Sequence, residues 1–583
     1  MRRIFVFLCI LVINIFNVYS QEKVYIPDAN FRSYLNSYYS DVMDSSNDSL
    51  IIVEAAKKTG TIDCRSRGIV DLTGIEYFTG ISQIYCHAND IEFIPDLSNV
   101  NSLTYLDCNT NNLTSIPKLP ESVEFLAFSY NPIADFPDLS SYAALKILYF
   151  TNTNVTTVSD LSANTALEEL YCYNNTNLTS LPDLSSNTNL IWLSCSYCSL
   201  TNLPNLPPSI QELECFGNDI TSLPNLSACT NLRSLSCYLN NLTILPDLSA
   251  NTSLTKLYCA YNNLTSLPDL SNLTELEVLS FYYNDVESIP DLSNLTKLKS
   301  LKCGGNYIKF LPDLSNNLLL EELNCGENEI TELPNLSLHN NLKSLYCSYN
   351  QLDTLPDLSE NDKLEELQCR GNSLKQLPEL LSTKLIMLDC CENELTSLPQ
   401  LPITLASLYC DDNLLQTLPD LSDLNNLTNL ECKNNRIKYL PDMSNNKKLY
   451  SVYISNNKLD FSDAREIRII DTLPELYYYS YNQSYFGERD TIIINEGNKL
   501  SMSIASQDSA LSYQWYKDNI AIEDATDTLY EVGEASLEME GTYVCFSFGK
   551  AQLMQVSESK IFCTIDYHRI CTWKMDTRFN DRC

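Results

Sequence analysis

The sequence predicts an α/β-type repeat solenoid with a parallel β-sheet on its concave face and a mostly non-helical convex side, followed by an all-β sandwich. First, 76 of the 90 leucines in the 583-residue chain lie between residues 101 and 450. Second, one unit recurs there about every 22 residues, and a fixed period of this length is typical of solenoids. Third, leucine becomes rare after residue 487, where apolar and polar residues alternate as in half-buried strands.

The repeating unit is shown by residues 342–362, LKSLYCSYNQLDTLPDLSEND, with the form L-x-x-L-x-C-x-x-N-x-L-x-x-L-P-D-L-S. Its second Leu and its Cys are two residues apart, so both enter the core from one strand while the residue between them points outward. The Cys position recurs in 19 registers, at Cys64, Cys86, Cys108, Phe128, Phe150, Cys172, Cys195, Cys215, Cys237, Cys259, Phe281, Cys303, Cys325, Cys347, Cys369, Cys390, Cys410, Cys432 and Ile454.

An asparagine column accompanies the Cys column. Asn stands three residues after the Cys position in 16 of the 19 units and is replaced by Arg67, Thr153 and Cys198. A polar side chain at one turn of every unit can bond the backbone of the neighbouring coil, which would otherwise bury unpaired N–H and C=O groups. We therefore expect this column to be scaffold.

The cysteines are predicted to be free, buried thiols. Of 23, fifteen occupy the ladder position, where a thiol acts as a small hydrophobe. Stacked strands lie about 4.8 Å apart, near bonding range. However, side chains on in-register parallel strands point the same way, whereas a disulfide needs converging Cβ atoms and a torsion near 90°. Cys391 falls just after a ladder position, and we expect it on the concave face as a reactive thiol.

Residues 1–20 are predicted to be an export signal, because two arginines precede a mostly apolar run that is too short to span a bilayer. Residues 21–60 are predicted to form a helical cap, with Phe31, Tyr34 and Leu35 at helical spacing. The loop starting at Asp44 is similar to a calcium-binding loop, but Ala55 stands where the bidentate Glu belongs. We therefore expect a capping loop without metal.

The repeat strongly resembles the leucine-rich repeat family over most of the chain, and the cap resembles that of bacterial leucine-rich repeat surface proteins. This resemblance implies a curved solenoid over residues 61–487 with about 19 repeats, ending in a capping strand within 473–487. Residues 488–562 resemble an immunoglobulin-like domain, with Trp515 as the core tryptophan and Tyr543 and Cys545 as the Y-x-C of a later strand. The partner Cys is missing. The order of parts resembles that of internalin-like adhesins.

The remaining tail, residues 563–583, holds Cys563, Cys571 and Cys583 and has no pattern that assigns it to a fold.

The composition of the chain excludes several classes of function. With 38 Lys+Arg against 74 Asp+Glu, the net charge of −36 argues against nucleic acid as a partner. Only 3 His and 14 Gly leave little material for His-based catalysis or Gly-rich phosphate loops. We therefore predict no catalytic residue, no metal and no cofactor.

The outward positions of the repeats are rich in tyrosine, which offers large amphipathic contact area at low entropic cost. The alternative is that Tyr simply suits an exposed parallel sheet. Our candidate ligand-binding residues are Tyr171, Tyr173, Tyr197, Tyr238, Tyr258, Tyr261, Tyr282 and Tyr283. Asp389, Glu392, Asp411, Asp412 and Glu431 form an acidic patch, which we expect to be a solvated face.

The leading hypothesis is an exported, non-catalytic binding protein, secreted or at the cell surface, whose concave face recognises an extracellular protein or glycan. No segment after the signal is predicted to span a membrane, and the sequence does not indicate an oligomeric state. One alternative is a secreted effector or enzyme whose repeats select the substrate. Another is a structural envelope or matrix protein without a specific ligand.

Overall fold

The structure is a computed structural model. It describes residues 22–443 and 445–459, and beyond them the segments 477–479, 499–503, 512–517, 520–527, 529–534, 541–548, 556–566 and 570–572. The predicted export signal lies outside the described residues. The chain divides into two compact units, Met1–Leu298 and Lys299–Cys583.

The first unit begins with two short antiparallel strands and the helices that lie between and after them. Strand β1 (Lys23–Tyr25) pairs antiparallel with β2 (Ser49–Ile51). Between them lie α2 (Ala29–Tyr38) and the 3-10 turn η1 (Ser40–Val42), and α3 (Ile52–Ala55) follows. Helix α2 begins where it does because the Asp28 side chain accepts a 2.7 Å hydrogen bond from the Phe31 amide, an N-cap. The helix buries Phe31, Tyr34 and Leu35, the three residues predicted to share its face.

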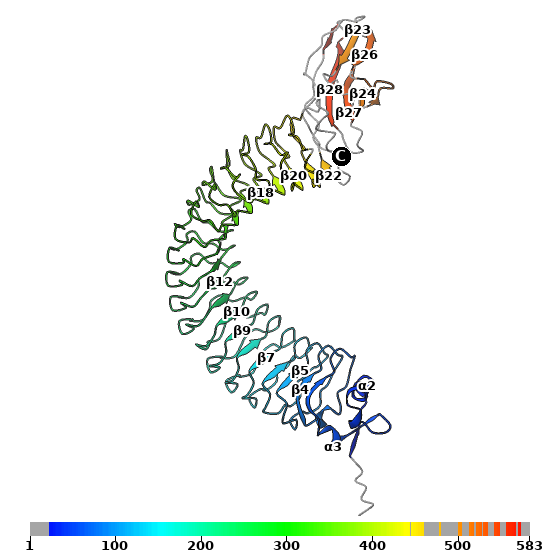
Figure 1. Ribbon diagram of the computed structural model, residues 1–583, viewed down its shortest axis with the longest axis vertical. Coiled ribbons are helices and arrows are strands. Elements are labelled where there is room, and N and C mark those ends of the chain that lie inside the picture. Colours follow the sequence, from blue (N-terminus) through cyan, green and yellow to red (C-terminus); the bar gives the residue numbers. More distant parts are fainter. Residues whose placement is uncertain are drawn as a thin grey trace, which may run out of the picture. The chain divides into compact units, whose positions relative to one another are not determined.

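A parallel ladder of short strands forms the rest of the first unit. Its strands lie along the inner side of the ribbon in Figure 1, and irregular connections form the outer side. The strands are β3 (Thr59–Asp63), β4 (Gly80–Tyr85), β5 (Tyr105–Asp107), β6 (Phe125–Ala127), β7 (Ile147–Tyr149), β8 (Glu169–Tyr171), β9 (Trp192–Ser194), β10 (Glu212–Glu214), β11 (Ser234–Ser236), β12 (Lys256–Tyr258) and β13 (Val278–Ser280). The 3-10 turn η2 (Ile75–Tyr77) lies between β3 and β4.

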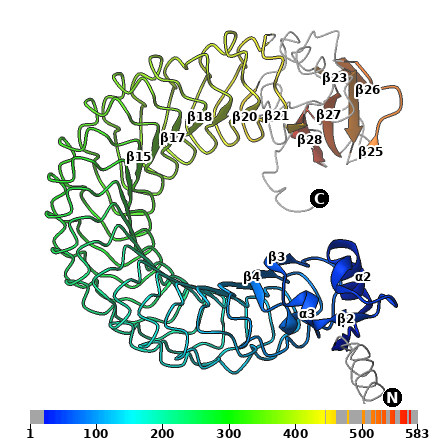
Figure 2. The same ribbon diagram turned by 60° about the horizontal axis from the view of Figure 1, so that its bottom comes forward.

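The second unit continues the same pattern, with its strands again on the inner side of the ribbon in Figure 2. Its parallel strands are β14 (Ser300–Lys302), β15 (Glu322–Asn324), β16 (Ser344–Tyr346), β17 (Glu366–Gln368), β18 (Met387–Asp389), β19 (Ser407–Tyr409), β20 (Asn429–Glu431), β21 (Ser451–Tyr453) and β22 (Tyr477–Tyr479). Strand β22 pairs in parallel with β21.

The register explains why the repeat is stable. The central leucines of adjacent strands stand opposite one another, as in the pair Leu235 and Leu257. Leu257 and the ladder thiol Cys259 are both fully buried, so the two alternate positions enter the core as predicted. Apart from η2, the described connections between β3 and β21 contain no helix. The prediction of a parallel solenoid with a mostly non-helical convex side is confirmed.

The asparagine column has the scaffold role that the sequence predicts. The Asn262 side-chain amide donates to the carbonyls of Cys237 (3.0 Å) and Cys259 (3.1 Å). Its Oδ1 accepts the Leu242 amide at 2.9 Å. One side chain thus satisfies backbone groups of two repeats, which would otherwise be buried without partners. Where Cys198 replaces Asn, its thiol donates to the Cys172 carbonyl at 3.3 Å and keeps one of these bonds.

A second asparagine column, on the convex side, was not predicted. Its members are Asn164, Asn187, Asn251, Asn317, Asn361 and Asn446, all fully buried. Asn251 shows the pattern: its amide donates to the carbonyls of Leu226 (3.0 Å) and Cys229 (2.8 Å) in the preceding repeat. These residues follow the L-P-D-L-S segment at a constant spacing, so the signal was present in the sequence.

All 18 cysteines among residues 22–459 are buried, and none of them forms a disulfide in the structure. Burial raises the pKa of thiols such as Cys172 and Cys215, which makes them poor nucleophiles. The expectation that Cys391 is a reactive thiol is wrong. Its side chain is only 1% exposed, burial raises its pKa, and its sulfur accepts the Asp411 amide at 3.2 Å.

Near the C-terminus the structure contains two antiparallel sheets. One pairs β23 (Lys499–Ser503) with β26 (Leu529–Glu534). The other has the order β25 (Ile520–Ala521), β24 (Ser512–Lys517), β27 (Gly541–Phe548), β28 (Val556–Asp566) and β29 (Ile570–Thr572). Trp515 is fully buried, and its indole N–H donates to the Asp527 carbonyl at 2.9 Å. Strand β28 crosses residue 562, the predicted end of the immunoglobulin-like domain, and the domain boundaries stay predictions.

Candidate functional site

The most continuous feature on the outward side of the strands is a row of rings that we call the aromatic stripe. One ring comes from each of the six consecutive strands β4 to β9, and each ring is half-buried. The stripe consists of Tyr85, Tyr105, Phe125, Tyr149, Tyr171 and Trp192.

Neighbouring rings of the stripe are in contact: two of the five pairs are stacked, and the other three are tilted by 36 to 43°. Successive ring centroids are 4.7, 4.0, 5.7, 4.2 and 6.0 Å apart from Tyr85 to Trp192. Tyr105 and Phe125 are inclined by only 5°, and Tyr149 and Tyr171 by only 1°. This follows from the strand spacing of about 4.8 Å, which suits ring stacking. In these two pairs the ring faces cover each other, and the ring edges are left for a partner.

The eight predicted tyrosines fall into separate groups, and only Tyr171 belongs to the aromatic stripe. Tyr238 stacks on Phe216 at 4.3 Å, and Phe216 meets Tyr197 edge to face at 5.2 Å. Farther along, Tyr261, Tyr282 and Tyr283 form a cluster with centroids 4.8 to 5.7 Å apart.

The two remaining tyrosines stand apart from these groups. Tyr173 is 36% exposed and follows the end of β8. Tyr258 is half-buried at the end of β12, and within the part of the chain that the structure describes it has no ring contact with the other seven. The predicted residues thus share a face, but they do not form one site.

Sequence reasoning missed four aromatic residues of this surface: Tyr105, Phe125, Trp192 and Phe216. Three of them stand immediately before the buried central leucine of their strand. That position points outward as well, because it is two residues from the other outward position. Reading both outward columns together would have found the stripe.

Several exposed tyrosines occupy a costly backbone position. Two residues after the Cys position, φ is positive, and Tyr stands there at Tyr130, Tyr197, Tyr261, Tyr283 and Tyr349 with φ of 50 to 55°. This left-handed conformation costs a non-glycine residue about 1 kcal/mol or more. Other repeats hold Ala88, Leu239 and Glu327 in the same conformation, so the turn of the repeat sets the backbone and leaves the side chain at this position free to vary.

Glycine at the same position in the next repeat makes room for two of these rings. A Cβ on Gly217 would lie 2.6 Å from the Tyr197 ring, and one on Gly371 would lie 2.5 Å from the Tyr349 ring. Each ring therefore lies flat over the turn that follows. Tyr197 and Tyr349 keep about half of their surface exposed, at 46% and 47%.

The predicted acidic patch, in the second unit, is largely ion-paired. Lys433 contacts both Asp411 and Glu431 at 3.1 Å, and Arg370 contacts Glu392 at 2.6 Å. Burial raises the pKa of Asp411 to about 6, against the lowering effect of Lys433. Among the residues that the structure describes, no group of three or more His, Cys, Asp or Glu side chains is placed to hold a metal ion.

The cap loop in the first unit is held by contacts within the protein. Asp44 accepts a hydrogen bond from the Ser46 hydroxyl at 2.6 Å and forms an ion pair with Lys23 at 3.0 Å.

The sequence matches one family model, described as leucine-rich repeats (2 copies), over residues 274–316. Together with the 22-residue periodicity of the strands, seen in pairs such as Leu235 and Leu257, this makes the chain a leucine-rich repeat protein. No curated protein matches the chain. Within the described residues, no helix is both long enough and apolar enough to cross a membrane.

Among solved structures, the chain is similar to YopM from Yersinia enterocolitica WA-314, with 29% identity over 65% of this chain and 78% of that one, and a TM-score of 0.57. It is also similar to the functional domain of InlJ from Listeria monocytogenes, which includes a cysteine ladder. That match has 23% identity over 90% of this chain and 96% of that one, and a TM-score of 0.47.

Proposed function

We propose that this protein is a non-catalytic binding protein that recognises another protein through the concave side of its first unit, with the aromatic stripe as the main contact. The observation that carries the proposal is the run of six half-buried rings on consecutive strands β4 to β9. Aromatic residues with polar tips are enriched at the centres of protein interfaces. The leucine-rich repeat fold and its likeness to YopM support a binding role.

The stacking favours a protein over a glycan as the partner. A sugar packs its C–H groups on the open face of an aromatic ring, but Tyr105, Phe125, Tyr149 and Tyr171 cover their faces with each other. Their edges suit apolar side chains, as in protein interfaces. The exposed rings of Tyr197, Tyr261 and Tyr283 extend this surface toward the later strands of the first unit.

The chemistry of the described residues supports binding rather than catalysis. Burial raises the pKa of the ladder thiols, so they are poor nucleophiles. The three-residue strands and tight turns also give the surface a fixed shape, which reduces the entropy lost on binding. The export signal at 1–20 and the immunoglobulin-like domain at 488–562 belong to this proposal, which places the protein outside the cell, secreted or at the surface.

The test begins with binding of the purified full chain to arrays of extracellular proteins and of glycans. We expect saturable binding to a protein target. A variant with Tyr105→Ser and Phe125→Ser, both on the stripe, should lose it. The matched control carries Tyr346→Ser and Tyr409→Ser, half-buried outward tyrosines of the second unit.

Thermal unfolding must show that both variants remain folded. Equal binding by the stripe variant and the control would contradict the proposal. Binding confined to glycans would contradict the assignment of a protein partner and would favour recognition of sugars elsewhere on the molecule, such as at the exposed rings beyond the stripe.

A further inference from the structure

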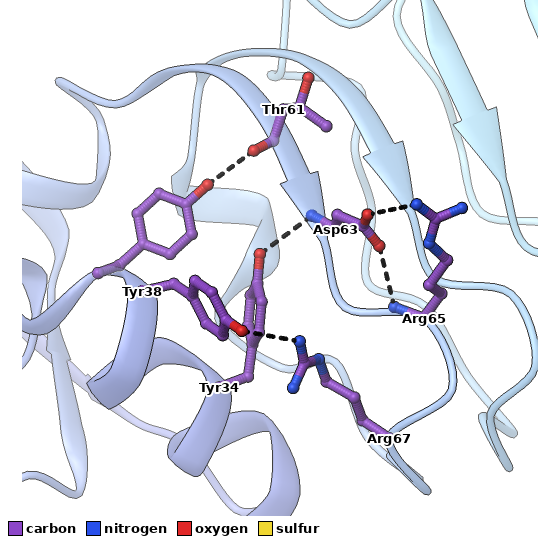
Figure 3. A pocket seen from close by; sticks show the side chains of 7 residues that line it. Tyr34, Tyr38, Thr61, Asp63, Arg65 and Arg67 are labelled. Atoms are coloured by element: carbon purple, nitrogen blue, oxygen red, sulfur yellow. Dashed lines mark hydrogen bonds and ion pairs between the residues drawn. The ribbon is translucent and has the colours of Figure 1, made fainter.

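A pocket lies where the first helix meets the first repeat, at the end of the aromatic stripe. It has a volume of about 580 Å³. Figure 3 shows its wall: tyrosines from and just after α2 on one side, and β3 with the turn that follows on the other. Its lining residues are Tyr34, Tyr38, Tyr39, Thr61, Asp63, Arg65 and Arg67.

Arg67 departs from the repeat pattern in a way that builds this pocket. It occupies the register of the asparagine column, and its amide donates to Asn89 Oδ1 at 2.9 Å. Its guanidinium lies over the rings of Tyr34 and Tyr38, 5.0 and 5.1 Å from their centroids. Stacking holds the guanidinium plane while leaving most of its N–H donors unused. Among the described residues, Arg67 forms no ion pair with a carboxylate.

The pocket is rich in donors and positive in a strongly negative chain. Arg65 pairs with Asp63 at 2.9 Å, so the three charged side chains of the lining sum to one positive charge, while the whole chain carries −36. Tyr38 accepts a 3.4 Å hydrogen bond from Arg67 and retains its own O–H as a donor. Burial keeps the Tyr34 hydroxyl protonated by raising its pKa. This donor set suits an anion with planar, bidentate geometry, namely a carboxylate.

The pocket is also continuous with the aromatic stripe. The Arg65 guanidinium lies 5.8 Å from the centroid of Tyr85, the first ring of the stripe. Tyr85 in turn stacks toward Tyr105 at 4.7 Å. A chain lying over the stripe can therefore end in, or send a side chain into, the pocket without leaving the surface.

We infer that this pocket binds a carboxylate of the polypeptide partner, supplied by its C-terminus or by an acidic side chain, with Arg67 as the main contact and Arg65 as the link to the stripe. The inference rests on the proposed function in one respect: it assigns the carboxylate to the protein that binds the aromatic stripe. The pocket itself can be tested with small probes, independently of any partner.

The experiment is saturation-transfer difference NMR on the full chain with N-acetyltyrosine, N-acetyltyrosinamide and the α-amide of N-acetylglutamate. We expect the amide that lacks a carboxylate to give a signal about tenfold weaker than the acids, since charge-assisted bidentate bonds are lost. A stronger signal from N-acetyltyrosine indicates a C-terminal carboxylate, and a stronger one from the glutamate derivative indicates a side chain.

The variants separate the pocket from the rest of the molecule. Arg67→Gln should abolish the signals of the acids, Arg65→Gln should weaken them, and the exposed Arg233→Gln should leave them unchanged. Arg67 also contacts α2, so thermal unfolding checks that the cap remains folded in Arg67→Gln. The Arg65 side chain makes no bond or ion pair with α2 among those described. Loss of probe binding in Arg65→Gln is therefore a second, independent test of the pocket.

Equal signals from acid and amide, or full signals in the Arg65→Gln, Arg67→Gln double variant, would overturn the inference. Glucuronate serves as a fourth probe, and a signal from it with none from the peptide probes would overturn the assignment of the carboxylate to a polypeptide. The stripe variant Phe125→Ser should leave probe binding intact, so failure of the stripe as a protein-binding surface is distinguishable from failure of the pocket.

Discussion

The two units share one scaffold but differ on the outward side of their strands. In both, the central leucines stand in register, as in the pairs Leu235–Leu257 and Leu345–Leu367. Outward, β4 to β9 carry a ring each, whereas the second unit carries charged pairs such as Lys302 with Glu322 at 2.9 Å. The buried columns therefore determine the fold, and the outward columns are free to determine what the surface binds.

The largest expected effect is the loss of stability when a residue of the asparagine column is replaced, and it tests whether the two units share one scaffold. Asn262 and Asn372 make the same bonds in the two units, each donating to two ladder carbonyls at 3.0 to 3.1 Å and accepting one amide of the preceding repeat. Replacing either with Ala leaves three buried backbone groups without this partner. We expect each change to lower the free energy of unfolding by about 3 kcal/mol.

Chemical denaturation of the two variants measures these costs. The exposed Asn241→Ala provides the control, since it shares the first unit but lies outside the column. A loss in one unit that is more than twice the loss in the other would show that the scaffold is not equivalent along the chain.

The next effect sharpens the contrast between the outward faces. We expect Tyr105→Ser and Phe125→Ser together to weaken binding of the protein partner at least about 30-fold, the scale of about 2 kcal/mol that interface hot spots carry. Tyr346→Ser and Tyr409→Ser together should change it less than about threefold, as for residues outside the centre of an interface. Surface plasmon resonance against the target found on the array provides the dissociation constants. The reverse ranking would move the site to the second unit.

The buried columns were predictable from the sequence, whereas the site was predictable only in part. Leu, Cys and Asn recur because a buried position tolerates few side chains, so periodicity reveals them. Outward positions have no such constraint, and Tyr105 and Trp192 were missed because they stand in a column that is polar in most other repeats. The pocket could not be predicted either, because Arg67 meets Tyr34 and Tyr38 only after the cap folds against the first repeat.

A smaller effect concerns the charged face of the second unit. Burial raises the pKa of Asp411 from 3.8 to about 6, so the folded state holds the proton more tightly than the unfolded state. The resulting stabilisation is complete below about pH 4 and is lost as the pH rises through 6. Asp411→Asn stays neutral, so it should raise the free energy of unfolding over the wild type at pH 7.5, by on the order of 1 kcal/mol, and have little effect at pH 4.5.

Thermal unfolding at the two pH values measures this difference, with the exposed Asp412→Asn as the control. Stabilisation by Asp411→Asn that is equal at both pH values would mean that ionisation of Asp411 is not its cause. No such dependence is expected for the aromatic stripe, whose only charged hydrogen-bond partner among the described residues is Glu169, which accepts the Tyr171 hydroxyl at 2.9 Å.

The smallest expected effect concerns the pairs of tyrosine and glycine that occur in both units. Gly217 and Gly371 have φ of 66° and 64° and lie under the rings of Tyr197 and Tyr349. We expect Gly217→Ala and Gly371→Ala each to lower the free energy of unfolding by about 1 kcal/mol from the left-handed backbone alone. The new methyl group must also displace the ring above it, which is exposed and able to move. Adding Tyr197→Ala to Gly217→Ala removes the ring, so the part of the cost that this second change recovers is the steric part. If the two glycine variants differ in stability and only Gly217→Ala weakens partner binding, the Tyr197 ring is held in place for the partner. If neither variant changes binding, the paired Tyr and Gly serve packing alone, and the binding surface ends at Trp192.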